Sequence, residues 1–99
     1  MAQVNKIPSW LTLAGDRVTV RLSKLTELNG VQLDAVSLRA PTVRDIRSAQ
    51  GGAQDEEQRE LNLFASLAEV GVKDLEGLAL KDYTRLQTGY FRLVQDDEL

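Results

Sequence analysis

The side chains of this sequence that could do chemistry are almost all carboxylates, ammonium groups and guanidinium groups. The 99 residues include 15 Asp and Glu and 12 Lys and Arg, but no His and no Cys. Without His or Cys the chain lacks the usual general base near neutral pH, every thiol nucleophile, and the nitrogen and sulfur ligands of zinc sites. No pair of carboxylates stands in an apolar stretch, the setting that gives two acids separate catalytic roles. We therefore expect no enzyme, no cofactor and no metal site.

Two short motifs resemble ligand sites, but local structure explains them better. Gly51-Gly52 lacks the Lys and the Ser or Thr that follow the glycines of a phosphate loop. Asp55, Glu56 and Glu57 are consecutive, so on a helix they point in different directions and lack the spacing of an oxygen cage. We interpret these acids as a cluster at a helix N-terminus, where the helix dipole favours negative charge.

Charge is distributed unevenly along the chain. Residues 1–47 contain seven basic and four acidic side chains, whereas residues 48–99 contain five basic and eleven acidic ones. Two interpretations remain open: solvated helix faces, or a field that steers head-to-tail self-association or attracts a basic partner. Nucleic acid is not an expected partner, because no concentrated basic stripe is present. With no apolar run near the roughly 20 residues of a membrane span and no signal-peptide pattern, we expect a cytoplasmic protein.

The first 40 residues have the pattern of antiparallel β-structure. Val18, Val20 and Leu22 alternate with polar residues, and Asn29-Gly30 is a strong hairpin signal, so a second strand should cover residues 31–39. The apolar alternation changes phase along both strands, which predicts a bulge near Lys24 and Asp34. The segment around Trp10, Leu11 and Leu13 is either a third strand, turning at Gly15-Asp16, or a docked arm.

The remainder of the chain has helical signals. Thr42 and Asp45 have the spacing of an N-cap and its acidic partner, which predicts a helix over residues 43–50. A longer amphipathic helix follows Asp55 and should end near Gly71 as its C′ residue. One turn over residues 73–78 and a last helix over residues 81–94 complete the pattern. Leu80 is grouped with Tyr83 and Leu86 in the apolar stripe of that last helix.

These elements predict an α+β fold in a single domain covering residues 1–99. A small antiparallel hairpin or three-stranded meander should precede three to four helices. Within the domain we assign residues 1–17 to an arm or extra strand, 18–40 to the hairpin, 42–94 to the helical part and 95–99 to an acidic tail.

Apolar and aromatic side chains on the helices are either core or a docking surface. The simplest interpretation is that they fill the core between the two long helices. If the apolar stripe is wider than one small sheet can bury, the surplus forms a groove for a partner helix or for a second copy. Trp10 is a further candidate anchor, because tryptophan often dominates interfaces. The candidate partner-binding residues are Leu61, Phe64, Leu67, Leu86, Tyr90, Phe91 and Trp10.

The order of these elements resembles the small tail assembly chaperones of contractile-tailed phages, the group that includes Mu-like and E-type tail assembly proteins. The resemblance is carried by the strand at residues 18–22, the turn Asn29-Gly30, and above all the sequence LRAPTVRDI at residues 38–46. The sequence LALKDY at residues 78–83 is similar to the start of that family's last helix. The likeness covers residues 18–94.

The resemblance implies a protein that keeps the tape-measure protein soluble in the host cell cytoplasm during tail tube assembly and is absent from the mature virion. It also implies possible contact with the tail tube protein, possible homo-oligomers, and often a longer frameshifted form. Two other functions remain open. One is a small virion component that oligomerises through its sheet edge, and the other is a regulatory adaptor or antitoxin-like binding protein.

Overall fold

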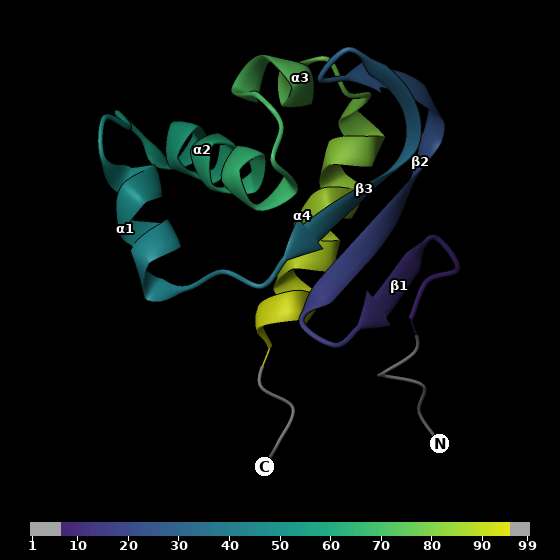
Figure 1. Ribbon diagram of the computed structural model, residues 1–99, viewed down its shortest axis with the longest axis horizontal. Coiled ribbons are helices and arrows are strands. Elements are labelled where there is room, and N and C mark those ends of the chain that lie inside the picture. The colour runs from purple at the N-terminus through teal and green to yellow at the C-terminus, as the bar shows by residue number, and fades with distance from the viewer. Residues whose placement is uncertain (1–6, 96–99) are drawn as a thin grey trace.

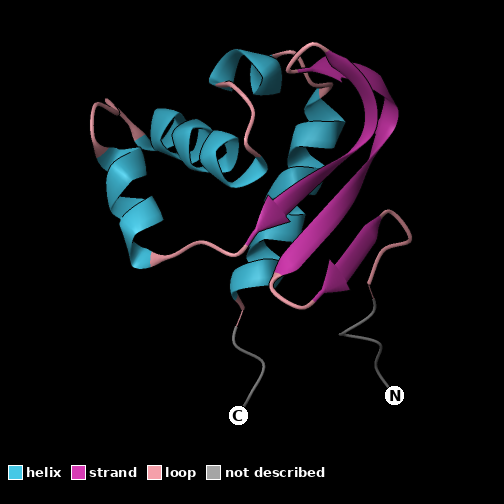
Figure 2. Cartoon of the chain, viewed as in Figure 1, coloured by secondary structure: helices cyan, strands magenta, loops and turns pink. Residues whose placement is uncertain are grey.

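The computed structural model describes residues 7–95 and has the predicted α+β architecture, with a three-stranded antiparallel sheet followed by four helices in that range (Figures 1 and 2). Residues 1–6 of the predicted arm and residues 96–99 of the predicted acidic tail lie outside the described residues. The elements are β1 Leu11–Ala14, β2 Arg17–Leu28, β3 Val31–Arg39, α1 Val43–Gln50, α2 Glu56–Ala68, α3 Val72–Glu76 and α4 Leu80–Val94.

The sheet is a meander with strand order β1-β2-β3. The β2–β3 hairpin turns at Asn29 and Gly30, whose φ angles of 55° and 81° are the positive values that a type I′ turn needs. The hairpin predicted from Asn29-Gly30 is therefore confirmed. The segment around Leu11 forms the third strand rather than a docked arm, and it turns at Gly15, where φ is 62°.

The predicted bulge is confirmed in the middle of the hairpin. Arg21 pairs with Ala35 and Thr26 pairs with Leu33, so residues 22–25 of β2 lie opposite the single residue Asp34 of β3. Leu22 at the start of this irregular segment and Leu28 beyond it are both buried, whereas Leu25 within it is 64% exposed.

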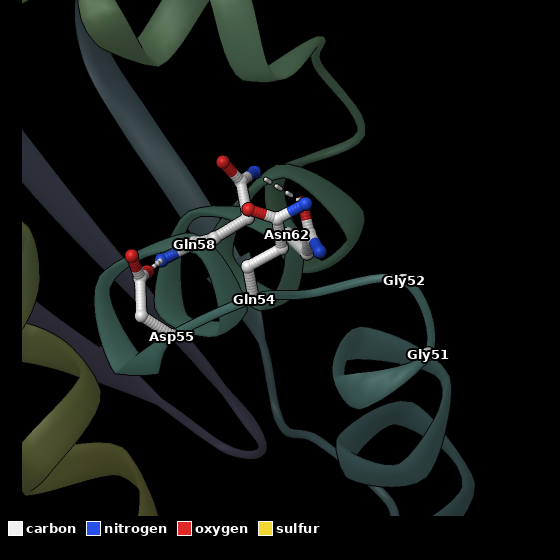
Figure 3. A pocket seen from close by; sticks show the side chains of 6 residues that line it. All are labelled: Gly51, Gly52, Gln54, Asp55, Gln58 and Asn62. Carbon is white, nitrogen blue, oxygen red and sulfur yellow. Dashed lines mark hydrogen bonds between the residues drawn. The ribbon is translucent and has the colours of Figure 1, made fainter.

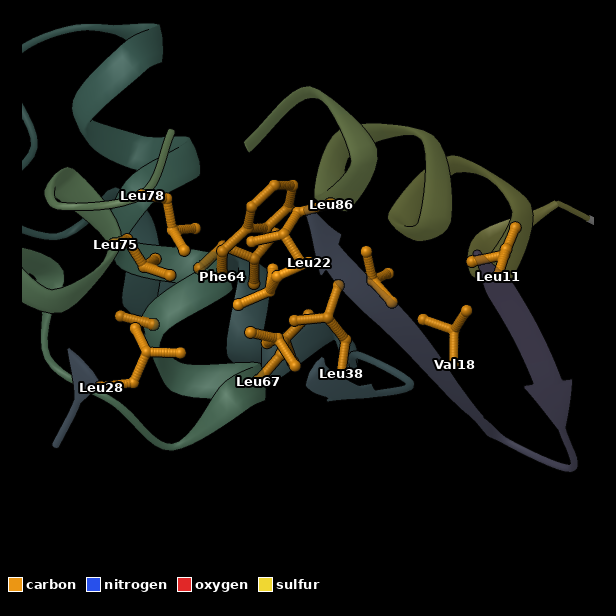
Figure 4. Close-up of a cluster of buried hydrophobic side chains, with 14 of the residues drawn as sticks. Leu11, Val18, Leu22, Leu28, Leu38, Phe64, Leu67, Leu75, Leu78 and Leu86 are labelled. Carbon is orange, nitrogen blue, oxygen red and sulfur yellow. The ribbon is translucent and has the colours of Figure 1, made fainter. Parts of the chain in front are cut away.

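Helix α4 crosses one face of the sheet, α2 lies beside β3, and α1 packs against α2 (Figure 1). Side chains from the strands and from α2, α3 and α4 point toward one another in a single core (Figure 4). The fully or nearly fully buried hydrophobic residues include Val18, Val20, Leu28, Leu38, Phe64, Leu67, Leu75 and Leu86.

A buried carboxylate joins α4 to the irregular part of β2. Asp82 is 0% exposed and lies in the first turn of α4. Its two carboxylate oxygens accept hydrogen bonds from the backbone N–H of Ser23 at 2.8 Å and from the Ser23 hydroxyl at 3.0 Å. Ser23 belongs to the segment that has no paired residue on β3, so Asp82 satisfies a backbone donor that the sheet cannot.

Gly89 allows α4 to lie close to the sheet. A Cβ atom at this position would stand 2.9 Å from Val20 Cγ2 and 3.2 Å from Leu11 Cδ1. The close neighbours of Gly89 are therefore side chains of the sheet.

The first two helices begin as predicted. The Thr42 hydroxyl accepts from the Asp45 N–H, and the Asp45 carboxylate accepts from the Thr42 N–H at 2.8 Å. The Arg39 guanidinium, 2.8 Å away, together with these bonds holds the pKa of Asp45 well below its usual range. Asp55 caps α2 by accepting from the Gln58 N–H at 2.8 Å, which confirms the capping role of the acidic cluster.

The predicted end of α2 is wrong by two residues. Glu69, with φ 60°, takes the left-handed position, and the Val70 N–H bonds to the Ala65 carbonyl at 3.0 Å. Gly71 is instead the N-cap residue of α3, and its N–H donates to the Asp74 carboxylate at 2.9 Å. The short connection to α3 thus decided which residue ends α2.

We expect Asp82→Ala to lower the free energy of unfolding by about 2–4 kcal/mol, because both bonds to Ser23 are lost and a backbone donor is left without its partner. Urea unfolding followed by circular dichroism measures the loss. Thr84→Ala, an exposed change in the same helix, should stay within about 0.5 kcal/mol of wild type. Equal stability of the two variants would contradict the role given to Asp82.

We expect Gly89→Ala to lower the free energy of unfolding by about 1–3 kcal/mol, because the new methyl group overlaps Val20. In an exposed helix the same change would stabilise by up to about 1 kcal/mol. Thr88→Ala, at an exposed neighbouring position, is the control for helix propensity in the same unfolding assay. Stabilisation by Gly89→Ala would show that the helix can move away from the sheet without cost.

Candidate partner-binding surface

Aromatic side chains fill the space between α2 and α4. The Phe64 ring is fully buried, and its centroid lies 5.7 Å from that of Tyr83 and 5.2 Å from that of Tyr90. Both pairs are tilted, an arrangement that adds about 0.5–1.5 kcal/mol to the burial of each pair. Phe64 therefore holds the two helices in a fixed relation.

Glu60 of α2 bonds to two side chains of α4. One of its carboxylate oxygens accepts from the Tyr83 hydroxyl at 2.8 Å and from the Gln87 amide at 2.9 Å, so α2 is bonded to α4 at two points one turn apart. Burial, and then the bond to Glu60, raises the pKa of Tyr83 well above its ordinary value. Burial also raises the pKa of Tyr90.

Two open clefts lie along these helices. We call the first the α3-side cleft; it measures about 290 Å³ and is lined by Glu57, Leu61, Leu75, Glu76, Leu78, Leu80 and Tyr83. We call the second the Arg59-side cleft; it measures about 420 Å³ and is lined by Glu56, Glu57, Arg59, Glu60, Leu63, Phe64, Gln87 and Tyr90. The Arg59 guanidinium is paired with Glu56, so the excess charge around both clefts is negative.

Beside the Arg59-side cleft, the outer side of α4 exposes two large apolar side chains. Phe91 is 63% exposed and Val94 is 45% exposed. Phe91 lies one turn after Gln87, which lines that cleft, so the exposed ring adjoins the cleft rim. We call Phe91, Val94 and the Arg59-side cleft the Phe91 surface.

The predicted partner-binding residues occupy three different environments. Phe64, Leu67 and Leu86 are buried in the core, and of these only Phe64 reaches the floor of a cleft described above. Leu61 and Tyr90 are half-buried and line the two clefts. Phe91 is exposed on the far side of α4 from the sheet. The structure thus brings Tyr90 and Phe91 to one surface, with Phe64 buried beneath it.

Trp10 lies away from that surface and is held by its own chain. The Arg85 guanidinium stands 5.1 Å from the centre of the Trp10 ring and also donates to the Arg21 carbonyl at 2.8 Å. The Trp10 carbonyl accepts from the Arg21 N–H at 2.8 Å. The half-buried ring packs against the core from the end of the sheet.

The grouping of Leu80 with Leu86 in one apolar stripe is wrong. Leu80 is 80% exposed, whereas Leu86 is fully buried. At 100° per residue, Leu80 is only about 20° from Phe91 around the helix but about 120° from Leu86. The position of Leu80 around the helix could have been calculated from the sequence. The bonds by which Glu60 joins α2 to α4 could not, because its partners are more than 20 residues away in the chain.

In the cleft beside Gly51 and Gly52, the side-chain amides of the lining form hydrogen bonds within the chain (Figure 3). The Gln58 amide donates to Asn62 at 2.9 Å, and the Asn62 amide donates to the Ala49 carbonyl at 3.1 Å. The bond between Asn62 and Ala49 ties α1 to α2, and the bond between Gln58 and Asn62 lies within α2. Within residues 7–95 no group of three acidic side chains is placed to hold a metal ion.

A known protein family matches most of this chain. The sequence model of the phage tail assembly chaperone proteins, described as E, or 41 or 14, matches residues 19–95 of this chain. The chain belongs to this family. Membership in a chaperone family points to a non-enzymatic role. The match includes the whole of α1 to α4 and therefore every element that forms the clefts.

Searches of the curated proteins and of the solved structures found no significant match. None of the helices in the described range combines the length and the apolar character that a membrane span requires.

We expect Tyr83→Phe to reduce the loss of stability at alkaline pH. A raised folded-state pKa means that the stabilisation is complete below the ordinary tyrosine pKa of about 10 and is lost as the pH rises above it. The variant should be about 1 kcal/mol less stable at pH 7, because the bond to Glu60 is gone, and its stability should fall less steeply above pH 10. Urea unfolding across this pH range measures both effects; parallel pH curves would contradict them.

Proposed function

We propose that this family member keeps the tape-measure protein soluble by binding its helical segments at the Phe91 surface. We further propose that it does so in the host cell cytoplasm, close to the tail tube protein as the tube assembles, and that it is absent from the finished virion. The observation that carries the proposal is the exposure of Phe91 and Val94 next to an open cleft floored by aromatic rings.

The Phe91 surface suits an amphipathic helix. The half-buried ring of Tyr90 gives the cleft an apolar floor above the buried Phe64, while Glu56, Glu60 and Gln87 give it a polar rim. A helix that lays its apolar side on such a surface keeps its polar side in water, so the loaded complex stays soluble. The open cleft and the short apolar stripe favour modest affinity, which a chaperone that must release its client requires.

Co-expression with the tape-measure protein tests the proposal. We expect the chain to raise the soluble yield of the tape-measure protein and to co-purify with it in several copies per client. A tape-measure protein that stays insoluble and unbound would refute the proposal. Mass spectrometry of purified particles separates a chaperone from a retained virion component, because only the latter would be found in the particle.

We expect the double variant Phe91→Ser and Val94→Ser to fold normally and to lose most of this solubilising activity, since both side chains are exposed and contribute little to the core. Leu25→Ser is the matched control, because Leu25 is 64% exposed but lies on the hairpin. Soluble and pelleted client are quantified with each variant. Normal activity of the double variant would show that the client binds elsewhere.

A further inference from the structure

Helix α1 exposes an apolar side chain between two arginines. Val43 is 77% exposed, and Val43, Arg44, Arg47 and Ser48 line one stretch of surface. Among residues 7–95 neither arginine forms an ion pair, and Asp45, the single acid of α1, is already bonded to Arg39 and Thr42. We call Val43, Arg44 and Arg47 the α1 face.

The α3-side cleft has the complementary character. Every charged residue in its lining is acidic: Glu57 comes from α2 and Glu76 from α3. Both carboxylates are exposed, and neither forms an ion pair within the described part of the chain. Leucine side chains complete the lining, including Leu80, which is 80% exposed. The cleft therefore fits an apolar side chain that carries positive charge on its flanks.

We propose that the α1 face of one copy docks into the α3-side cleft of a second copy. Val43 contacts exposed Leu80 and half-buried Leu61, and Arg44 and Arg47 pair with Glu57 and Glu76. The two surfaces cannot meet within one chain, because α1 and α3 lie on opposite sides of α2 (Figure 1). A second copy supplies the missing partner for both surfaces.

The proposed contact is heterologous, since two different surfaces of the chain meet. Repetition of such a contact gives a ring or an open row of copies rather than a closed two-fold dimer. The small patch and the exposed charges favour weak, salt-sensitive association. The contact leaves Phe91 and Val94 outside, so the proposal does not depend on the nature of the client.

Sedimentation velocity of the full chain at low salt, over a series of concentrations, tests the contact. The weight-average sedimentation coefficient of the wild type should rise with concentration, and added salt should suppress the rise because it screens exposed charges. Arg44→Glu with Arg47→Glu should weaken self-association roughly tenfold or more, and so should Glu57→Lys with Glu76→Lys. Circular dichroism verifies that each variant is folded.

The decisive result is whether self-association returns when the two charge-reversed variants are mixed. An equimolar mixture of the two reversed variants should associate again, because the acidic α1 face of one fits the basic cleft of the other. The control mixture combines Arg17→Glu and Arg21→Glu with Glu27→Lys and Asp34→Lys, which give the same two net charges at exposed sheet positions.

Two results would overturn the proposal. One is a wild-type chain that stays monomeric at every concentration at low salt. The other is a control mixture that gains as much association as the test mixture, because attraction between net charges would then explain both.

Discussion

The structure depends on the attachment of α4 to the sheet by the Asp82 carboxylate. The bulge in β2 leaves the backbone N–H of Ser23 without a strand partner, and Asp82 supplies one from a position 59 residues later in the chain. A fully buried carboxylate is tolerated only where hydrogen bonds compensate its loss of water. Here the bonds to Ser23 and the N-terminal end of the α4 dipole provide that compensation. The bulge and the helix therefore fix each other's position.

With α4 fixed, the rest of the helical layer follows. Gly89 lets the far end of α4 approach Val20, so the helix contacts the sheet along its length. Phe64 then sets the separation of α2 from α4 through its contacts with Tyr83 and Tyr90. Because large rings occupy the space between the helices, their outer edges stay apart and leave the two clefts. The two clefts are thus a consequence of how the core between the helices is filled.

Much of this could be predicted from the sequence because the signals are local. Asn29-Gly30 determines the hairpin turn, the phase change along β2 predicts the bulge, and Thr42 with Asp45 marks the start of α1. The end of α2 could not be predicted in the same way. Glu69 takes a left-handed conformation that glycine usually takes, whereas Gly71 has a φ of −84° and is the N-cap residue of α3. The residue that ends α2 depends on where α3 begins, and the local preference of glycine for helix ends does not supply that information.

The sequence by itself determined the fold class, the order of the elements, the segregation of charge between the two halves, and the motif that marks the family. These features rest on residues close together in the chain, where backbone preference and apolar spacing act directly. Only the tertiary structure decided which apolar residues are core and which are surface. Leu86 and Phe91 stand on the same helix, yet one is fully buried and the other is 63% exposed. Asp82 and Gly89 determine which side of α4 faces the sheet, because they contact β2, a strand about 60 residues earlier in the chain.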